Sequence, residues 1–128
     1  MSASAPPPAG NSFRPRIRVQ HGPEIALGPG KVDLLDAIEQ TGTLAGAAQA
    51  LGMSYMRAWK LVQTMNACFR QPLVETSRGG TGHGKARLTE TGRAVRDLYR
   101  RMEETSRQAV EPLWEELTRH LQDGPNPI

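Results

Sequence analysis

A short run of side chains that donate or accept hydrogen bonds lies in the middle of the chain. It combines hydroxyl, guanidinium, indole, ammonium and amide groups: Ser54, Tyr55, Arg57, Trp59, Lys60 and Gln63. Side chains of these types bind base edges and phosphate oxygens in nucleic acids. The residue types therefore indicate binding chemistry, with nucleic acid as the candidate partner, provided that neighbouring elements hold them on one surface.

The element before this run is predicted to be a short amphipathic helix. Its apolar residues follow the i, i+3, i+4, i+7 spacing of one helical face: Leu44, Ala47, Ala48 and Leu51. Thr43 is placed as its N-cap. Gly52 follows where the helix must end, because glycine adopts a left-handed conformation there without a Cβ penalty.

The polar run itself is predicted to lie on a second helix that begins after Ser54 as N-cap. Its packing stripe consists of apolar residues at helical spacing: Ala58, Leu61, Val62, Met65 and Phe69. A helix, a glycine-containing turn and a second helix with basic residues near its start are typical of a helix-turn-helix, whose second helix enters the DNA major groove. The alternative is an all-α domain that binds no DNA, in which Tyr55 and Trp59 are half-buried packing residues.

Two strand-like runs follow, residues 73–77 and 85–88, and they flank a glycine-dense turn. A β-hairpin directly after a helix-turn-helix is a wing, which commonly lies along the sugar-phosphate backbone. Its basic residues are the candidates for phosphate contact: Arg78, His83, Lys85 and Arg87. Positive charge on a backbone with little side-chain bulk suits such a contact.

The long terminal segment is predicted to be a helix with Thr89 as N-cap. We expect it to run from Glu90 to about Val110, with either a kink or a new start at Pro112. Its apolar residues keep a near-heptad spacing: Val95, Leu98, Met102, Ala109, Leu113, Leu117 and Leu121. This stripe exceeds what a small core can cover, so Val95, Leu98, Met102, Leu113 and Leu117 are the candidate interface of a homodimer.

The expected organisation has four parts. Residues 1–12 form a disordered tail rich in Ser, Ala and Pro, residues 13–89 the winged helix-turn-helix, residues 90–122 the linker and dimerisation helix, and residues 123–128 a tail. Two elements precede the helix-turn-helix. The first is a hairpin of residues 13–20 and 24–27, and the second is a helix marked by Val32 to Ile38 that ends near Gln40. The fold class is thus mainly α with small β-hairpins.

Composition and motifs argue against other functions. The net charge of +3 and pI near 9.5 mildly favour a polyanionic partner. The loop GGTGHGKA, residues 79–86, misses the phosphate-binding motif because Ala86 lacks the hydroxyl that binds Mg²⁺ and no helix follows directly. His21, His83 and His120 show no metal-ligand spacing with one another or with Cys68, which we expect to be buried and unreactive. We expect no enzyme activity, metal or cofactor.

The first residues show no basic region followed by an apolar run, so we expect no signal sequence, and no segment is long and apolar enough to span a membrane. We therefore expect a cytoplasmic protein.

The chain resembles the N-terminal DNA-binding domain of the molybdate-responsive ModE family, a relative of LysR-type winged helix-turn-helix regulators. Two segments carry the resemblance: LLDAIEQTGTLAGAAQALGMSYMRAWKLVQTMN and PLVETSRGGTGHGKARLTETG. It implies a homodimer on a two-fold symmetric operator in double-stranded DNA, with the six polar residues of the second helix facing the major groove. Full-length ModE proteins continue into a molybdate-binding region, whereas this sequence ends at Ile128, so we do not expect molybdate to bind it.

Two hypotheses remain at this stage. The first is a sequence-specific transcription regulator, ModE-like, with a connection to molybdenum metabolism by resemblance. The alternative is a protein-interaction adaptor of winged-helix fold that lacks specific DNA recognition.

Overall fold

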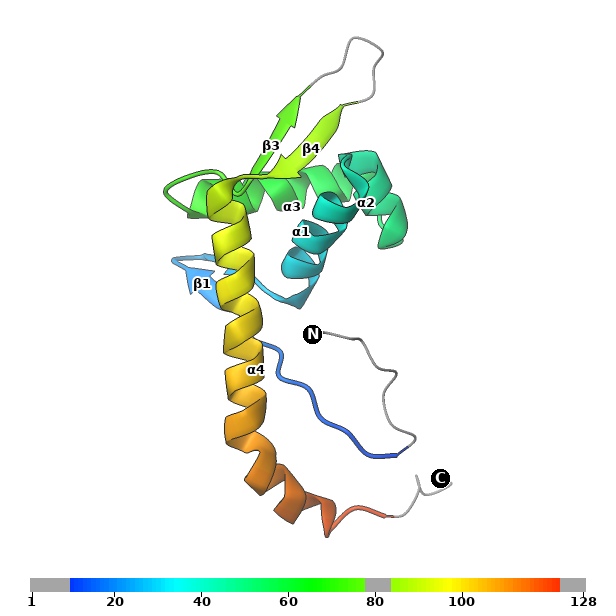
Figure 1. Ribbon diagram of the computed structural model, residues 1–128, viewed down its shortest axis with the longest axis vertical. Coiled ribbons are helices and arrows are strands. Elements are labelled where there is room, and N and C mark those ends of the chain that lie inside the picture. The colour runs from blue at the N-terminus through cyan, green and yellow to red at the C-terminus, as the bar shows by residue number, and fades with distance from the viewer. Residues whose placement is uncertain (1–9, 78–83, 123–128) are drawn as a thin grey trace.

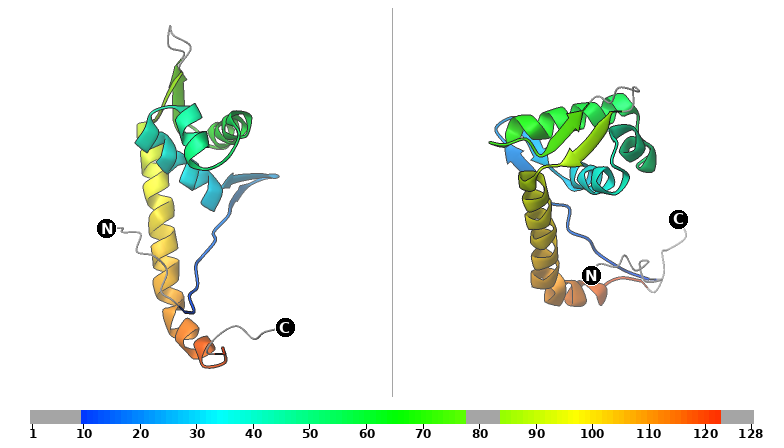
Figure 2. Two further views of the ribbon diagram at one scale, coloured as in Figure 1. Left: turned by 90° about the vertical axis from the view of Figure 1, so that its right-hand side faces the viewer. Right: turned by 45° about the horizontal axis from the view of Figure 1, so that its top comes forward.

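The computed structural model describes residues 10–77 and 84–122. Three helices, α1 (Pro29–Thr41), α2 (Leu44–Ala50) and α3 (Tyr55–Cys68), form a bundle. The hairpin β3–β4 (Val74–Ser77 and Lys85–Leu88) projects from one end of this bundle, and the long helix α4 (Glu90–Thr118) projects from the other (Figures 1 and 2). The predicted winged helix-turn-helix followed by a long helix is therefore confirmed. The predicted tails at residues 1–9 and 123–128 lie outside the described residues.

The predicted caps of the helix-turn-helix are confirmed. The backbone N–H of Gly46 donates to Thr43 Oγ1 at 2.9 Å, and that of Arg57 donates to Ser54 Oγ at 3.1 Å. Gly52 has a φ of 68°, the left-handed conformation that the turn requires. These contacts fix where α2 ends and α3 begins, and they set the orientation of α3.

A single apolar core joins the bundle to the wing and to the start of α4. It is built from residues of all four helices, three of the strands and the residue before β3: Leu27, Val32, Leu34, Leu35, Ala37, Ile38, Leu44, Ala47, Ala48, Ala58, Val62, Met65, Leu73, Val74, Ala86, Leu88 and Tyr99. Leu51 was predicted to share the packing face of α2, but it caps the end of the helix and is exposed. The helix α1 begins at Pro29, earlier than predicted, because proline is favoured at the first helical position.

The N-terminal hairpin is shorter than predicted. Strands β1 (Val19–His21) and β2 (Glu24–Leu27) pair in antiparallel fashion, and residues 13–18 have no strand partner in the described structure. This segment contacts α4 at two points instead. The hydroxyl of Tyr99 donates to the carbonyl of Ile17 at 2.7 Å, and the rings of Phe13 and Trp114 lie 5.1 Å apart. Burial raises the pKa of Tyr99, so its hydroxyl remains a donor.

The wing is attached to α3 through one amide side chain. Oδ1 of Asn66 accepts from the backbone N–H groups of Leu73 and Val74 at 2.8 and 3.2 Å, and Nδ2 donates to the carbonyl of Val74 at 3.0 Å. Asn66 thus pairs three backbone groups at the entrance to β3. It holds the hairpin at a fixed position relative to α3.

Helix α4 begins as predicted at the cap Thr89, whose Oγ1 accepts from the N–H of Gly92 at 2.9 Å. It continues through Pro112 as one helix, so the alternative of a new start there is wrong. The ribbon bends in its last turns (Figure 1), as expected where proline removes a backbone hydrogen bond. No helix of the described residues is long and apolar enough to cross a membrane.

Arginines of α4 tie this helix to α1. Arg96 contacts Asp36 at 2.8 Å and Glu39 at 2.7 Å, while Arg100 contacts Asp33 at 3.1 Å and Asp36 at 2.6 Å. Burial lowers the pKa of Arg96, but hydrogen bonds to three carboxylates outweigh it and raise the pKa overall. Both arginines therefore stay charged, and the ion pairs help to fix the angle between α4 and the bundle.

Candidate nucleic-acid interface

All six polar residues predicted for recognition are exposed and are spread around the solvent side of α3 and its cap: Ser54, Tyr55, Arg57, Trp59, Lys60 and Gln63. The side opposite packs Ala58, Val62 and Met65 into the core, each no more than 1% exposed. Tyr55 and Trp59 are 54% and 43% exposed, so each is half-buried, as the packing alternative predicts, and each keeps about half of its surface free to contact a partner. One face of α3 is therefore packed and the other is available to a partner, as the sequence predicted.

The centre of the exposed face carries Met56, Lys60, Gln63 and Ala67. Each of these residues lies two positions before a residue of the packing stripe, which places it about half a turn around the helix from that stripe. Sequence reasoning included Lys60 and Gln63 but missed Met56. The same periodicity could have found it, because Met56 is one of the positions that the stripe leaves outside.

The two cations on this face are available for an outside partner. In residues 10–77 and 84–122, neither Arg57 nor Lys60 forms an ion pair, although other arginines of the domain do. Ser54 uses its oxygen as an acceptor for the N-cap, and its hydroxyl hydrogen can still be donated. The arrangement presents hydrogen-bond donors at the start of a helix whose first turn carries no acidic residue, which suits the acceptor-rich major groove.

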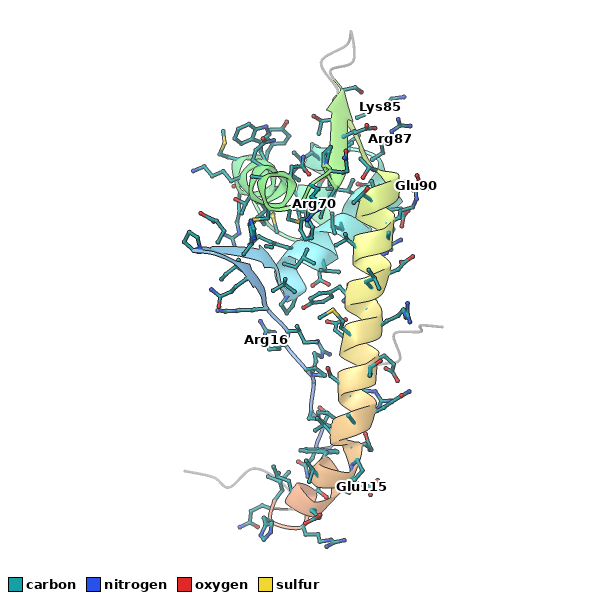
Figure 3. The ribbon with its side chains drawn as sticks, turned by 90° about the vertical axis from the view of Figure 1, so that its left-hand side faces the viewer. Arg16, Arg70, Lys85, Arg87, Glu90 and Glu115 are labelled. Carbon is teal, nitrogen blue, oxygen red and sulfur yellow. The ribbon has the colours of Figure 1, made fainter. Side chains whose placement is uncertain are left out.

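The basic residues of the wing lie on a different side of the domain. In the β3–β4 register, Glu75 pairs with Arg87 and Ser77 with Lys85, so these four side chains share the face turned away from the core. Figure 3 shows Lys85 and Arg87 on the side of the hairpin away from α3. The other two predicted wing residues, Arg78 and His83, lie outside the described residues.

The positive charge of this wing face is reduced by an ion pair. The guanidinium of Arg87 lies 3.1 Å from Glu75 Oε1, with both side chains more than half exposed. Exposed pairs of this kind contribute little to stability and exchange easily with other partners. Lys85 forms no ion pair in the described part of the chain, and this makes it the stronger candidate for phosphate contact on the wing.

Helix α4 presents most of the predicted apolar stripe to solvent. Leu98, Met102, Leu113 and Leu117 are 53%, 43%, 65% and 51% exposed. Val95, in contrast, is half-buried against the core, so much of its surface is already covered within the domain. The sequence did not predict that Phe13 covers Trp114 further along the same helix.

Cys68 is only partly buried, which corrects the expectation of a buried thiol. It lies near the end of α3 in a shallow hollow shared with Gln63 and the turn of the first hairpin, residues 21–24. This end of α3 packs against the core through Met65 and Phe69 instead. Within the described residues, no group of three or more His, Cys, Asp or Glu side chains could hold a metal ion.

Residues 30–93 match the bacterial regulatory helix-turn-helix proteins of the lysR family. The molybdenum-pterin-binding protein MopA of Rhodobacter capsulatus is 49% identical over 79 residues, 62% of this chain and 30% of MopA. The molybdenum transport protein ModE of Azotobacter vinelandii is 34% identical over 105 residues, 82% of this chain and 39% of ModE. The chain therefore spans about a third of the length of these relatives.

Solved structures share the fold. The DNA-binding domain of CbnR in complex with DNA superposes with a TM-score of 0.53 at 23% identity, covering 69% of this chain and 95% of that one. Full-length LysG of Corynebacterium glutamicum with bound arginine effector gives 0.52 at 23% identity, covering 73% of this chain and 30% of that one. At these identities the likeness concerns the fold alone. The resemblance noted in the sequence is confirmed, and the chain belongs to the lysR family of bacterial regulatory helix-turn-helix proteins.

Proposed function

We propose that this chain is the DNA-binding part of a transcription regulator linked to molybdenum, and that it binds a two-fold symmetric operator as a homodimer. The observation that carries the proposal is the exposed face of α3. It brings Arg57, Lys60 and Gln63 together on a capped helix whose opposite face is fully packed. Such a helix fits the width of the major groove, and its donors match acceptors on base edges.

The link to molybdenum comes from the relatives. MopA and ModE are named for molybdenum-pterin binding and molybdenum transport, and the ModE of Escherichia coli K12 is named a DNA-binding transcriptional dual regulator. Because the matched region covers only about a third of each, the proposal assigns DNA binding to this chain and assigns it no molybdate site. The proposal places the protein in the cytoplasm, together with its DNA.

In this proposal the parts of the domain have separate roles. The α3 residues Ser54, Tyr55, Arg57, Trp59, Lys60 and Gln63 contact base edges, and the wing residues Arg78, His83, Lys85 and Arg87 contact the backbone. Lys85 and Arg87 face away from α3, so we assign them a backbone segment beside the groove that α3 enters. Phosphate contacts position the protein without sequence preference, whereas base contacts specify the site.

The proposal is tested by selecting bound fragments from random double-stranded DNA. We expect the recovered fragments to share a two-fold symmetric sequence whose half-sites lie about one helical turn, roughly 34 Å, or a multiple of it apart. Recovery of fragments with no common sequence would contradict the proposal. That outcome would favour the adaptor hypothesis, which predicts equal affinity for all sequences.

The homodimer is tested separately through the exposed stripe of α4. We expect the protein to sediment as a dimer at micromolar concentration. The double substitution Leu113→Glu and Leu117→Glu should convert it to a monomer, because charged groups would replace apolar contacts between the two copies. The matched control is Glu115→Gln on another face of the helix (Figure 3), which should remain dimeric. Sedimentation of the unsubstituted protein as a monomer would exclude this use of α4.

A further inference from the structure

Three large apolar side chains stand exposed at the head of α3. Tyr55, Met56 and Trp59 are 54%, 57% and 43% exposed, and their i, i+1 and i+4 positions place them on adjoining parts of the helix surface. Hydrogen bonding to base edges uses the hydroxyl of Tyr55 and the indole N–H of Trp59, but it gives no role to Met56. Adjoining exposed apolar side chains of this kind are typical of a surface that contacts a partner.

The surroundings of these side chains indicate which kind of partner fits. Arg57 lies between Met56 and Trp59 in sequence, and Lys60 lies one turn after Met56. An apolar protein surface that covered Met56 would also desolvate these cations, which is costly unless acidic groups are supplied. DNA supplies phosphates for the cations and, within the major groove, one apolar group on the base edges, the 5-methyl group of thymine.

We propose that Tyr55, Met56 and Trp59 contact thymine 5-methyl groups, with Met56 as the central contact. This inference rests on the proposed function and adds to it a base preference at the positions facing the head of α3. Methionine suits the role because its unbranched, polarisable side chain adapts to the position of a methyl group. The half-site is therefore expected to contain at least one thymine recognised through its methyl group.

The test uses the full chain and a selected duplex in which single thymines are replaced by uracil. Uracil keeps the hydrogen-bonding groups of thymine and lacks only the methyl group. At the position that faces Met56, we expect the substitution to weaken binding on the order of fourfold, the effect of removing one methyl group from an apolar contact. The Met56→Ala variant, which lacks the contacting side chain, should bind the uracil duplex and the thymine duplex with equal affinity.

Two further variants separate loss of the methyl contact from general damage. Met56→Leu keeps an apolar side chain and should remain sensitive to uracil at that position. Lys60→Ala should bind more weakly overall but keep the same ratio between thymine and uracil duplexes. Because Met56 is exposed, its substitution should leave the melting temperature unchanged.

The outcomes are distinguishable from failure of the proposed function. Specific binding that no uracil substitution weakens would overturn the inference and leave the proposed function intact. A uracil effect of equal size in the protein and in Met56→Ala would also overturn it. Binding without sequence preference would overturn both.

Discussion

Replacing Gly92 by alanine is expected to lower the free energy of unfolding by about 3 kcal/mol, a large fraction of the stability of a small domain. Gly92 is buried in the first turn of α4, and an added Cβ would collide with the backbone carbonyl of Leu73. That carbonyl also accepts from the N–H of Thr89 at 2.9 Å. Backbone cannot rotate away as a side chain would, so the junction of the wing with α4 must shift. Urea unfolding followed by circular dichroism measures the loss.

Gly30 provides the matched control. It also lies in the first turn of a helix, α1, but an added Cβ there meets no atom within 4 Å. Gly30→Ala should be neutral or stabilise by up to about 1 kcal/mol, because alanine has the higher helix propensity. If Gly92→Ala is as stable as Gly30→Ala, that result would contradict the close approach of α4 to the backbone just before β3.

The second large effect is expected for DNA binding. Lys60→Ala or Arg57→Ala should weaken binding to a selected operator by about 1 to 3 kcal/mol if each side chain contacts a base edge, with a much smaller loss on unrelated DNA. Both side chains are exposed on α3 and form no ion pair within the described residues, so their removal leaves the core intact. Titration of labelled duplexes at fixed salt measures both losses.

Lys85→Ala on the wing is the control for this comparison. It should weaken binding to every sequence about equally, because a phosphate contact carries no sequence preference, and it should reduce the salt dependence. Arg87→Ala should have a smaller effect, since Arg87 already pairs with Glu75. Equal behaviour of Lys60→Ala and Lys85→Ala on all duplexes would contradict the separate roles of α3 and the wing.

The sequence predicted the elements that short-range rules control. Thr43, Ser54 and Thr89 each accept from a backbone N–H three residues later, and the packing stripe of α3 packs against the core as its spacing required. The exposed face of α3 followed from the same periodicity. That these side chains contact DNA, and that the α4 stripe contacts a second copy, stay predictions.

Contacts between distant parts of the chain were missed. Tyr99 meets Ile17 and Arg100 meets Asp33 across 82 and 67 residues, and no local pattern joins such partners. Acidic residues in α1 and arginines in α4 were visible in the sequence, but their pairing depends on how the two helices cross. Residues 13–18 alternate like a strand because Ile17 faces α4, and the alternation alone did not identify that partner.

Sequence recognition by α3 is tested most directly by comparing a selected operator with a scrambled duplex of the same length and composition, at two salt concentrations. If α3 recognises DNA sequence, the operator should bind about 1,000-fold more tightly or better. Both affinities should fall steeply between roughly 50 mM and 200 mM salt as phosphate counterions are released. Equal affinity for the two duplexes, or binding that salt does not weaken, would contradict the claim that α3 recognises DNA sequence.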